Sequence, residues 1–149
     1  MKKILAGTLL LIAVSSQKAQ AQDYKFGLGL RLSTDAPSIS NSITARYFLN
    51  QEEALEGMLS FGSRFGVGLL YEKYKPLGAS GFKWFYGAGA YVGFQGGDTY
   101  LGPAGIIGLD YKFTEAPVNI SLDWKPELDI IPKVNLIPDA FGLSARYTF

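Results

Sequence analysis

The sequence predicts an all-β fold, namely a closed, up-and-down, antiparallel barrel of eight strands. Apolar and polar residues alternate with a period of two from Tyr24 onward, and no stretch of ten residues carries the apolar stripe of an amphipathic helix. Turn-forming residues separate the alternating segments. These segments number eight, and an even number lets the first and last strands pair antiparallel and close the sheet.

The first 21 residues have the pattern of a secretory signal peptide. Lys2 and Lys3 precede an apolar run over residues 4–14, and Ala19 and Ala21 form a small-x-small cleavage site. The apolar run is too short to cross a bilayer as a helix. We expect cleavage after Ala21, so that removing 21 of the 149 residues leaves a single domain of 128, residues 22–149.

The composition of the expected mature chain argues against several classes of function. The 14 basic residues fall to 11 when Lys2, Lys3 and Lys18 are removed, against 13 acidic residues, so we expect no nucleic-acid partner. The sequence has no Cys, which rules out disulfides and thiolate metal sites. It also has no His, the usual base at neutral pH. We therefore expect no enzymatic activity and no cofactor.

The first four predicted strands each have an apolar row facing one way. The strand over residues 24–33 sets this row against a second row of Lys25, Gly27, Gly29, Arg31 and Ser33. The next three cover residues 39–49, 55–61 and 65–72. Their apolar rows, with that of the first strand, are Tyr24, Phe26, Leu28, Leu30, Leu32; Ile39, Ile43, Ala45, Tyr47, Leu49; Leu55, Leu59, Phe61; and Phe65, Val67, Leu69, Tyr71.

The second half continues the pattern over residues 84–94, 107–113, 118–125 and 141–149. Its apolar rows are Trp84, Tyr86, Ala88, Ala90, Val92, Phe94; Ile107, Leu109, Tyr111, Phe113; Val118, Ile120, Leu122, Trp124; and Phe141, Leu143, Ala145, Tyr147, Phe149. Turn signals lie at 35–37, 50–53, 63–64, 76–81, 95–98 and 114–117, and a longer Pro-containing connection covers 127–139.

The composition of the two rows indicates which one faces inward. In a soluble barrel the apolar rows would face the lumen and the other rows would face water. Those other rows, however, are rich in Gly, which is a weak strand former, and the narrow interior of an eight-stranded barrel needs small side chains. Aromatic residues also gather at strand ends, as a membrane interface selects. We therefore expect a transmembrane barrel with the apolar rows facing lipid.

The expected signal peptide, the alternating strands and the final FGLSARYTF resemble the small eight-stranded outer-membrane barrels of Gram-negative bacteria, the OmpA transmembrane-domain and OmpX-like group. The resemblance covers residues 22–149. It implies location in the outer membrane, contact with outer-membrane lipid and lipopolysaccharide, and a monomeric state. It also implies that the barrel assembly machinery recognises an assembly signal at alternate positions of the last strand: Phe141, Leu143, Ala145, Tyr147 and Phe149.

Charged residues on the predicted inward rows are the main candidate site. Five of them lie a few residues from the same end of the barrel: Arg46, Glu56, Glu72, Asp110 and Arg146. Buried charges must pair, so we expect one ring of alternating sign that stabilises the interior. A gated ion path through these residues is the functional alternative.

The connection over residues 127–139 carries more apolar residues than a solvated loop requires. We expect a hairpin that projects above the bilayer, or a lid over the barrel mouth. An exposed apolar patch often marks an interaction site, so docking of lipopolysaccharide or a partner is the alternative.

Together these features predict an integral outer-membrane barrel with a structural or surface-interaction role in the cell envelope. A narrow, porin-like channel or a conduit for hydrophobic small molecules is one alternative. A soluble periplasmic ligand-binding barrel is another.

Overall fold

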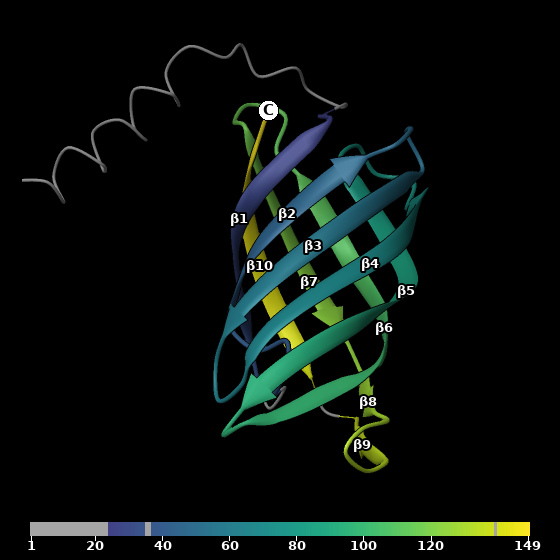
Figure 1. Ribbon diagram of the computed structural model, residues 1–149. Helices are drawn as coiled ribbons and strands as arrows, with labels where there is room; N and C mark the ends of the chain where they lie inside the picture. The colour runs from purple at the N-terminus through teal and green to yellow at the C-terminus, as the bar shows by residue number, and fades with distance from the viewer. Residues whose placement is uncertain (1–23, 35–36, 139) are drawn as a thin grey trace, which may run out of the picture.

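The computed structural model describes residues 24–34, 37–138 and 140–149, and these residues form strands, turns and bends (Figure 1). None of the described residues belongs to a helix that is long and apolar enough to cross a membrane. The expected signal peptide lies outside the described residues, so cleavage after Ala21 stays a prediction.

Eight long strands close into an antiparallel barrel, which confirms the predicted fold class (Figure 1). Each barrel strand pairs with two neighbours, and β10 pairs with both β1 and β7. A shorter hairpin extends from β6 outside the ring. The barrel strands are β1 (Phe26–Ser33), β2 (Ser42–Phe48), β3 (Glu53–Phe61), β4 (Phe65–Pro76), β5 (Phe82–Gln95), β6 (Asp98–Lys112), β7 (Val118–Trp124) and β10 (Phe141–Thr148); the hairpin strands are β8 (Glu127–Asp129) and β9 (Asn135–Ile137).

The two ends of the barrel differ in their connections. One end carries both ends of the described barrel chain, Tyr24 and Phe149, and the loops 49–52, 77–81 and 113–117; we call it the terminal end. The opposite end carries the loop between β1 and β2, the short turns 62–64 and 96–97, and the β8–β9 hairpin; we call it the hairpin end. In Figure 1 the terminal end is at the top.

The barrel has its polar side chains inside and its apolar side chains outside. The alternation along β1 shows the contrast, because Leu30 is 63% exposed while the next residue, Arg31, is fully buried. The same contrast holds around the ring. Exposed apolar side chains include Leu28, Leu32, Ile43, Val67, Leu69, Ile107, Leu109, Leu122 and Leu143, and buried polar side chains include Thr44, Arg46, Glu56, Glu72, Asn119, Ser121 and Ser144.

Glycines on the inward rows let large interior side chains fit. Gly108 in β6 lies next to Phe85, and a Cβ atom added at Gly108 would lie 2.7 Å from Phe85 Cζ. That separation is too short for two carbon atoms, so only glycine accommodates the ring at its present position. The expectation that the narrow interior requires small residues is met at this position.

The prediction for the sixth strand was too short. Residues 107–113 were expected, whereas β6 begins at Asp98 and pairs with β5 across the turn residues Gly96 and Gly97. Both glycines have positive φ, 59° and 84°, as a tight two-residue hairpin requires. The apolar alternation is interrupted by Gly102-Pro103-Ala104-Gly105, so the periodicity did not reveal this half of the strand.

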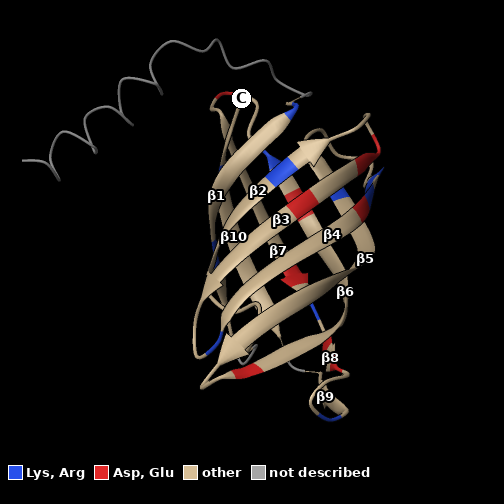
Figure 2. Cartoon of the chain, viewed as in Figure 1, with Lys and Arg blue, Asp and Glu red and all other residues tan. Residues whose placement is uncertain are grey.

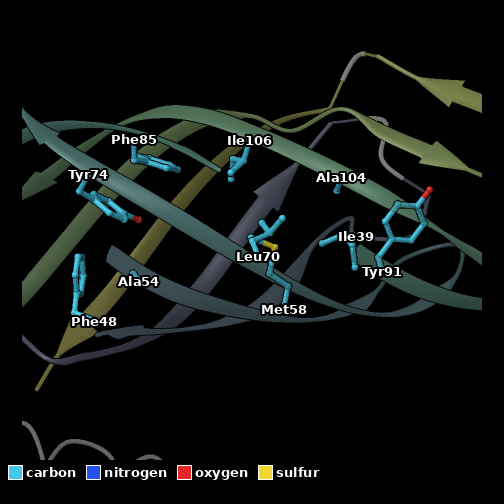
Figure 3. Close-up of a cluster of buried hydrophobic side chains, with 10 residues drawn as sticks. All are labelled: Ile39, Phe48, Ala54, Met58, Leu70, Tyr74, Phe85, Tyr91, Ala104 and Ile106. Atoms are coloured by element: carbon cyan, nitrogen blue, oxygen red, sulfur yellow. The ribbon is translucent and has the colours of Figure 1, made fainter. Parts of the chain in front are cut away.

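The prediction for Ile39 was wrong. It was placed on the outward row of the second strand, but β2 begins at Ser42, and Ile39 lies in the preceding connection with only 2% of its surface exposed. Residues 37–41 of this connection lie at the hairpin end, where Ile39 packs among buried apolar residues (Figure 3). Strand periodicity says nothing about a side chain once the chain has left the strand.

Candidate functional site: a charged interior closed at both ends

The structure brings all five predicted inward charges together near the terminal end. Figure 2 shows bands of both charge colours on β2 and β3 toward this end. We call these five residues, Arg46, Glu56, Glu72, Asp110 and Arg146, the terminal network. Arg46 lies at its centre. Its guanidinium lies 2.8 Å from Asp110 Oδ1, 3.3 Å from Glu56 Oε2 and 3.5 Å from Glu72 Oε2. The arrangement is therefore a hub rather than the ring of alternating sign that we expected.

Arg146 is the second cation of the terminal network. It forms an ion pair with Glu56 and donates hydrogen bonds of 2.7 Å to Ser121 and 3.2 Å to Asn119. Asn119 in turn donates a hydrogen bond of 2.9 Å to Asp110, and Thr44 donates one to Glu56. Thr44, Asn119 and Ser121 were not among the predicted residues, although they occupy the same inward rows and could have been found from their parity.

Four aromatic rings close the interior on the terminal side of this network. Successive ring centroids lie 5.1 Å apart from Tyr24 to Phe48, 5.0 Å from Phe48 to Tyr74 and 5.1 Å from Tyr74 to Phe85. Arg46 lies over the last two rings, 5.1 Å and 5.3 Å from their centroids. These four residues form the aromatic floor, of which Figure 3 shows Phe48, Tyr74 and Phe85.

Buried apolar side chains occupy the middle of the interior on the β3–β6 side. Met58, Leu70 and Ile106 are each no more than 5% exposed and lie between the aromatic floor and the hairpin-end residues Ile39 and Tyr91 (Figure 3). Packing of these side chains leaves little room for water between them. The middle of the barrel is therefore a filled core on this side.

The hairpin end holds buried charges as separate pairs. Arg31 of β1 reaches Asp123 of β7 with two hydrogen bonds, of 2.6 Å to Oδ1 and 3.1 Å to Oδ2. Both side chains are almost completely buried. This geometry is the two-pronged pairing that a guanidinium and a carboxylate prefer.

The other two pairs lie at the base of the β8–β9 hairpin, and the Arg64–Asp129 pair attaches it to the turn between β3 and β4. Asp129 accepts hydrogen bonds of 3.0 Å from Arg64 and 2.7 Å from the Tyr91 hydroxyl. Glu127 accepts a hydrogen bond of 2.6 Å from Lys125 Nζ and one of 3.1 Å from the backbone N–H of Ile39. These contacts also involve the connections between the long strands, which is why they were not predicted; the alternation of Lys125, Glu127 and Asp129 was the available signal.

In the described part of this connection, β8 and β9 form a hairpin that leaves the barrel rim, which agrees with the expected hairpin; its projection above a bilayer stays a prediction (Figure 1). Its base also covers the interior, because Glu127 and Asp129 point inward and are each 1% exposed. The apolar side chains of its outer part are exposed: Ile130, Ile131, Val134 and Leu136.

The five residues predicted to form an assembly signal share one outward row of β10 and the residue after it. Phe141, Leu143 and Phe149 are 53%, 52% and 48% exposed. Ala145 is exposed as well, and Tyr147 is half-buried. They alternate with buried Ser144 and Arg146.

In the part of the chain that the structure describes, no three His, Cys, Asp or Glu side chains are placed to hold a metal ion. The fold and the interior together define a small, closed, eight-stranded β-barrel protein. No protein-family model matches the chain, and no curated protein matches it either.

Proposed function

We propose that this protein is an integral outer-membrane β-barrel with a structural or surface-interaction role in the cell envelope, akin to the OmpA transmembrane-domain and OmpX-like group. The observation that carries the proposal is the reversed polarity of the fold. The outer wall is apolar on every barrel strand, while the interior holds ion pairs such as Arg31–Asp123.

Water is a poor solvent for this outer wall. A soluble monomer rarely exposes a continuous apolar patch of more than a few hundred Å². Here side chains such as Leu30, Leu69 and Leu122, each more than half exposed, come from widely separated strands. A bilayer removes that cost, and the closed ring satisfies the backbone hydrogen bonds that hydrocarbon cannot.

The filled interior favours a structural role over conduction. The charges of the terminal network are paired with one another, and the aromatic floor and the Met58–Leu70–Ile106 layer flank them. A structural network cross-links distant strands, as Arg46 of β2 does by binding Asp110 of β6. We accordingly propose a monomer whose partners are outer-membrane lipid, lipopolysaccharide and, during biogenesis, the barrel assembly machinery.

Cysteine scanning of β10 tests the membrane assignment directly, because the chain has no native cysteine. Leu143→Cys and Ala145→Cys place a thiol on the outward row, and Ser144→Cys is the matched inward control. In bacterial membranes we expect the outward thiols to react with a lipid-soluble maleimide and to be protected from a charged one. Folded protein in the soluble periplasmic fraction, with outward thiols open to the charged reagent, would refute the proposal.

Conductance in planar bilayers separates the structural role from a channel. We expect the refolded protein to pass little current, since paired side chains occupy the lumen. Steady ion-selective current from the unmodified barrel would instead support a gated path through the terminal network.

A further inference from the structure

We propose that the mouth at the terminal end binds a small amphiphilic anion with a flat apolar body. This site adjoins the terminal network at Asp110 and goes beyond the proposed envelope role. Two adjoining cavities of about 380 Å³ and 300 Å³ open there. They share Tyr24, Phe48, Gln51 and Lys83, and we call the combined space the vestibule.

The base of the vestibule is the aromatic floor. Tyr24 and Phe48 line both cavities, and Tyr74 lines the larger one. Flat rings of this kind offer apolar and stacking contact to a flat ligand. The Tyr24 hydroxyl is neutral near pH 7, as a phenol ordinarily is, and burial raises its pKa further, to about 12, so it carries no charge that would repel an anion.

Three lysines make the vestibule cationic. Lys83 and Lys112 lie on the inward rows of β5 and β6 at this end of the barrel. Lys25 lies at the rim just before β1, with its Nζ 5.9 Å from the ring centroid of exposed Tyr47. Within the described residues, none of the three ammonium groups forms an ion pair with a carboxylate. Lys112 Nζ donates to the carbonyls of Phe113 and Ala116 at 2.6 Å and 2.9 Å, and Lys83 Nζ lies 3.5 Å from the carbonyl oxygen of Gln51.

The acidic groups of the vestibule do not cancel this charge. Asp110 is already held by Arg46 at 2.8 Å and by Asn119 at 2.9 Å. Glu52 lies on an exposed turn at the rim, where water screens its charge. A cationic rim above an aromatic floor recognises one negative group attached to a flat apolar body.

The size of the vestibule sets the size of the ligand. The larger cavity is within the range of about 300–1,000 Å³ typical of small-molecule sites. A bicyclic aromatic sulfonate or carboxylate fits within such a space. A bare inorganic anion would leave the floor uncovered, and a cation would meet three ammonium groups.

Titration with 2-naphthalenesulfonate tests the proposal, with 2-naphthol as the neutral analogue. The full mature barrel is reconstituted in nanodiscs of zwitterionic lipid, and binding is followed by calorimetry and by backbone amide shifts. We expect saturable one-site binding that is about tenfold tighter for the sulfonate than for naphthol, since two or three partly exposed charge contacts each add modestly to the affinity. The shifted amides should belong to the loops 49–52 and 77–81.

Two lysine variants assign the site, and a third is the control. Lys83→Gln and Lys25→Gln should each weaken sulfonate binding about two- to fivefold, and the double variant about tenfold, while naphthol binding stays unchanged. Lys75→Gln removes the same charge at the same end but from an exposed side chain that does not line the vestibule, so it should bind like the parent.

Equal affinity for sulfonate and naphthol, equal losses in the Lys75 and Lys83 variants, or amide shifts spread over the outer wall would each overturn the proposal. Binding in the mouth does not depend on what surrounds the wall. If the protein folds in water and not in a bilayer, the envelope role fails, and the same titration in buffer still decides the vestibule.

Discussion

The two ends of the barrel interior hold buried charges by different arrangements. At the terminal end one guanidinium, that of Arg46, forms ion pairs with three carboxylates and lies over a ring of the aromatic floor. At the hairpin end each cation has its own carboxylate, as in Arg31–Asp123 and Arg64–Asp129. A shared hub couples many strands but depends on one residue, whereas separate pairs can be lost or replaced one at a time.

Loss of the hub should have the largest effect. Arg46→Ala leaves Glu56, Glu72 and Asp110 buried beside Arg146 alone. We expect the free energy of unfolding to fall by an amount near the upper end of about 3–5 kcal/mol, the cost of breaking a buried ion pair. Urea unfolding in detergent micelles, followed by tryptophan fluorescence, measures it.

Two further variants calibrate that result. Arg146→Ala should cost less, because Glu56 keeps Arg46 as a counter-ion. Lys133→Ala, on the exposed tip of the hairpin, should leave the unfolding curve unchanged. An Arg46→Ala barrel with unchanged resistance to heat and urea would show that the network contributes nothing to stability.

The Arg31–Asp123 pair gives the next largest effect and the sharpest contrast with the hub. Arg31→Met or Asp123→Leu alone should cost toward the lower end of about 3–5 kcal/mol, because a single charge is left without its partner. The double variant Arg31→Met/Asp123→Leu should recover most of that loss, since a well-packed apolar pair of similar volume can replace a buried ion pair.

The same double replacement in the hub should fail. Arg46→Met/Asp110→Leu still leaves Glu56 and Glu72 with one cation between them. Urea unfolding of the parent, the two double variants and the four single variants Arg31→Met, Asp123→Leu, Arg46→Met and Asp110→Leu forms two double-mutant cycles. Equal recovery in both cycles would contradict the distinction between a hub and a pair.

Release of the hairpin should have a smaller and local effect. Asp129→Asn removes the charge that holds Arg64 and weakens the acceptor for Tyr91. We expect a cost of about 1–3 kcal/mol, that of a disturbed buried hydrogen-bond set. Hydrogen exchange should rise in β8 and β9 while the barrel strands stay protected. Asn135→Ala, on exposed β9, is the control.

Much of the terminal end could be predicted from the sequence, and much of the hairpin end could not. Arg46, Glu56 and Asp110 lie within long strands, where a period of two fixes which side chains face inward. The register then brings them together, as Arg46 opposite Glu56 shows. The hub geometry was not predictable, because the reach of one guanidinium to three strands depends on barrel diameter and side-chain rotamers.

The hairpin end depends on segments that lack this periodicity. Ile39 and Arg64 lie in connections, and their positions are set by tertiary contacts with Glu127 and Asp129. Those two carboxylates could be recognised as alternating with Lys125, but their contacts with Ile39 and Arg64 could not. The first half of β6 was not predicted for a related reason: small residues and Pro103 replace the apolar row there, so the sequence shows no alternation.

The smallest effect should come from the ion pair between Lys73 and Glu53 on the outer surface of the terminal end. Their charged atoms lie 3.8 Å apart, and the side chains are 46% and 33% exposed. Water and salt screen such a pair, and holding two flexible side chains together has an entropic cost. Lys73→Gln should therefore leave the unfolding curve within experimental error, in contrast to Arg31→Met, which also removes one cation of one pair. A loss comparable to that of Arg31→Met would mean that solvent does not screen this part of the wall, and that burial is not what separates the interior pairs from the exterior one.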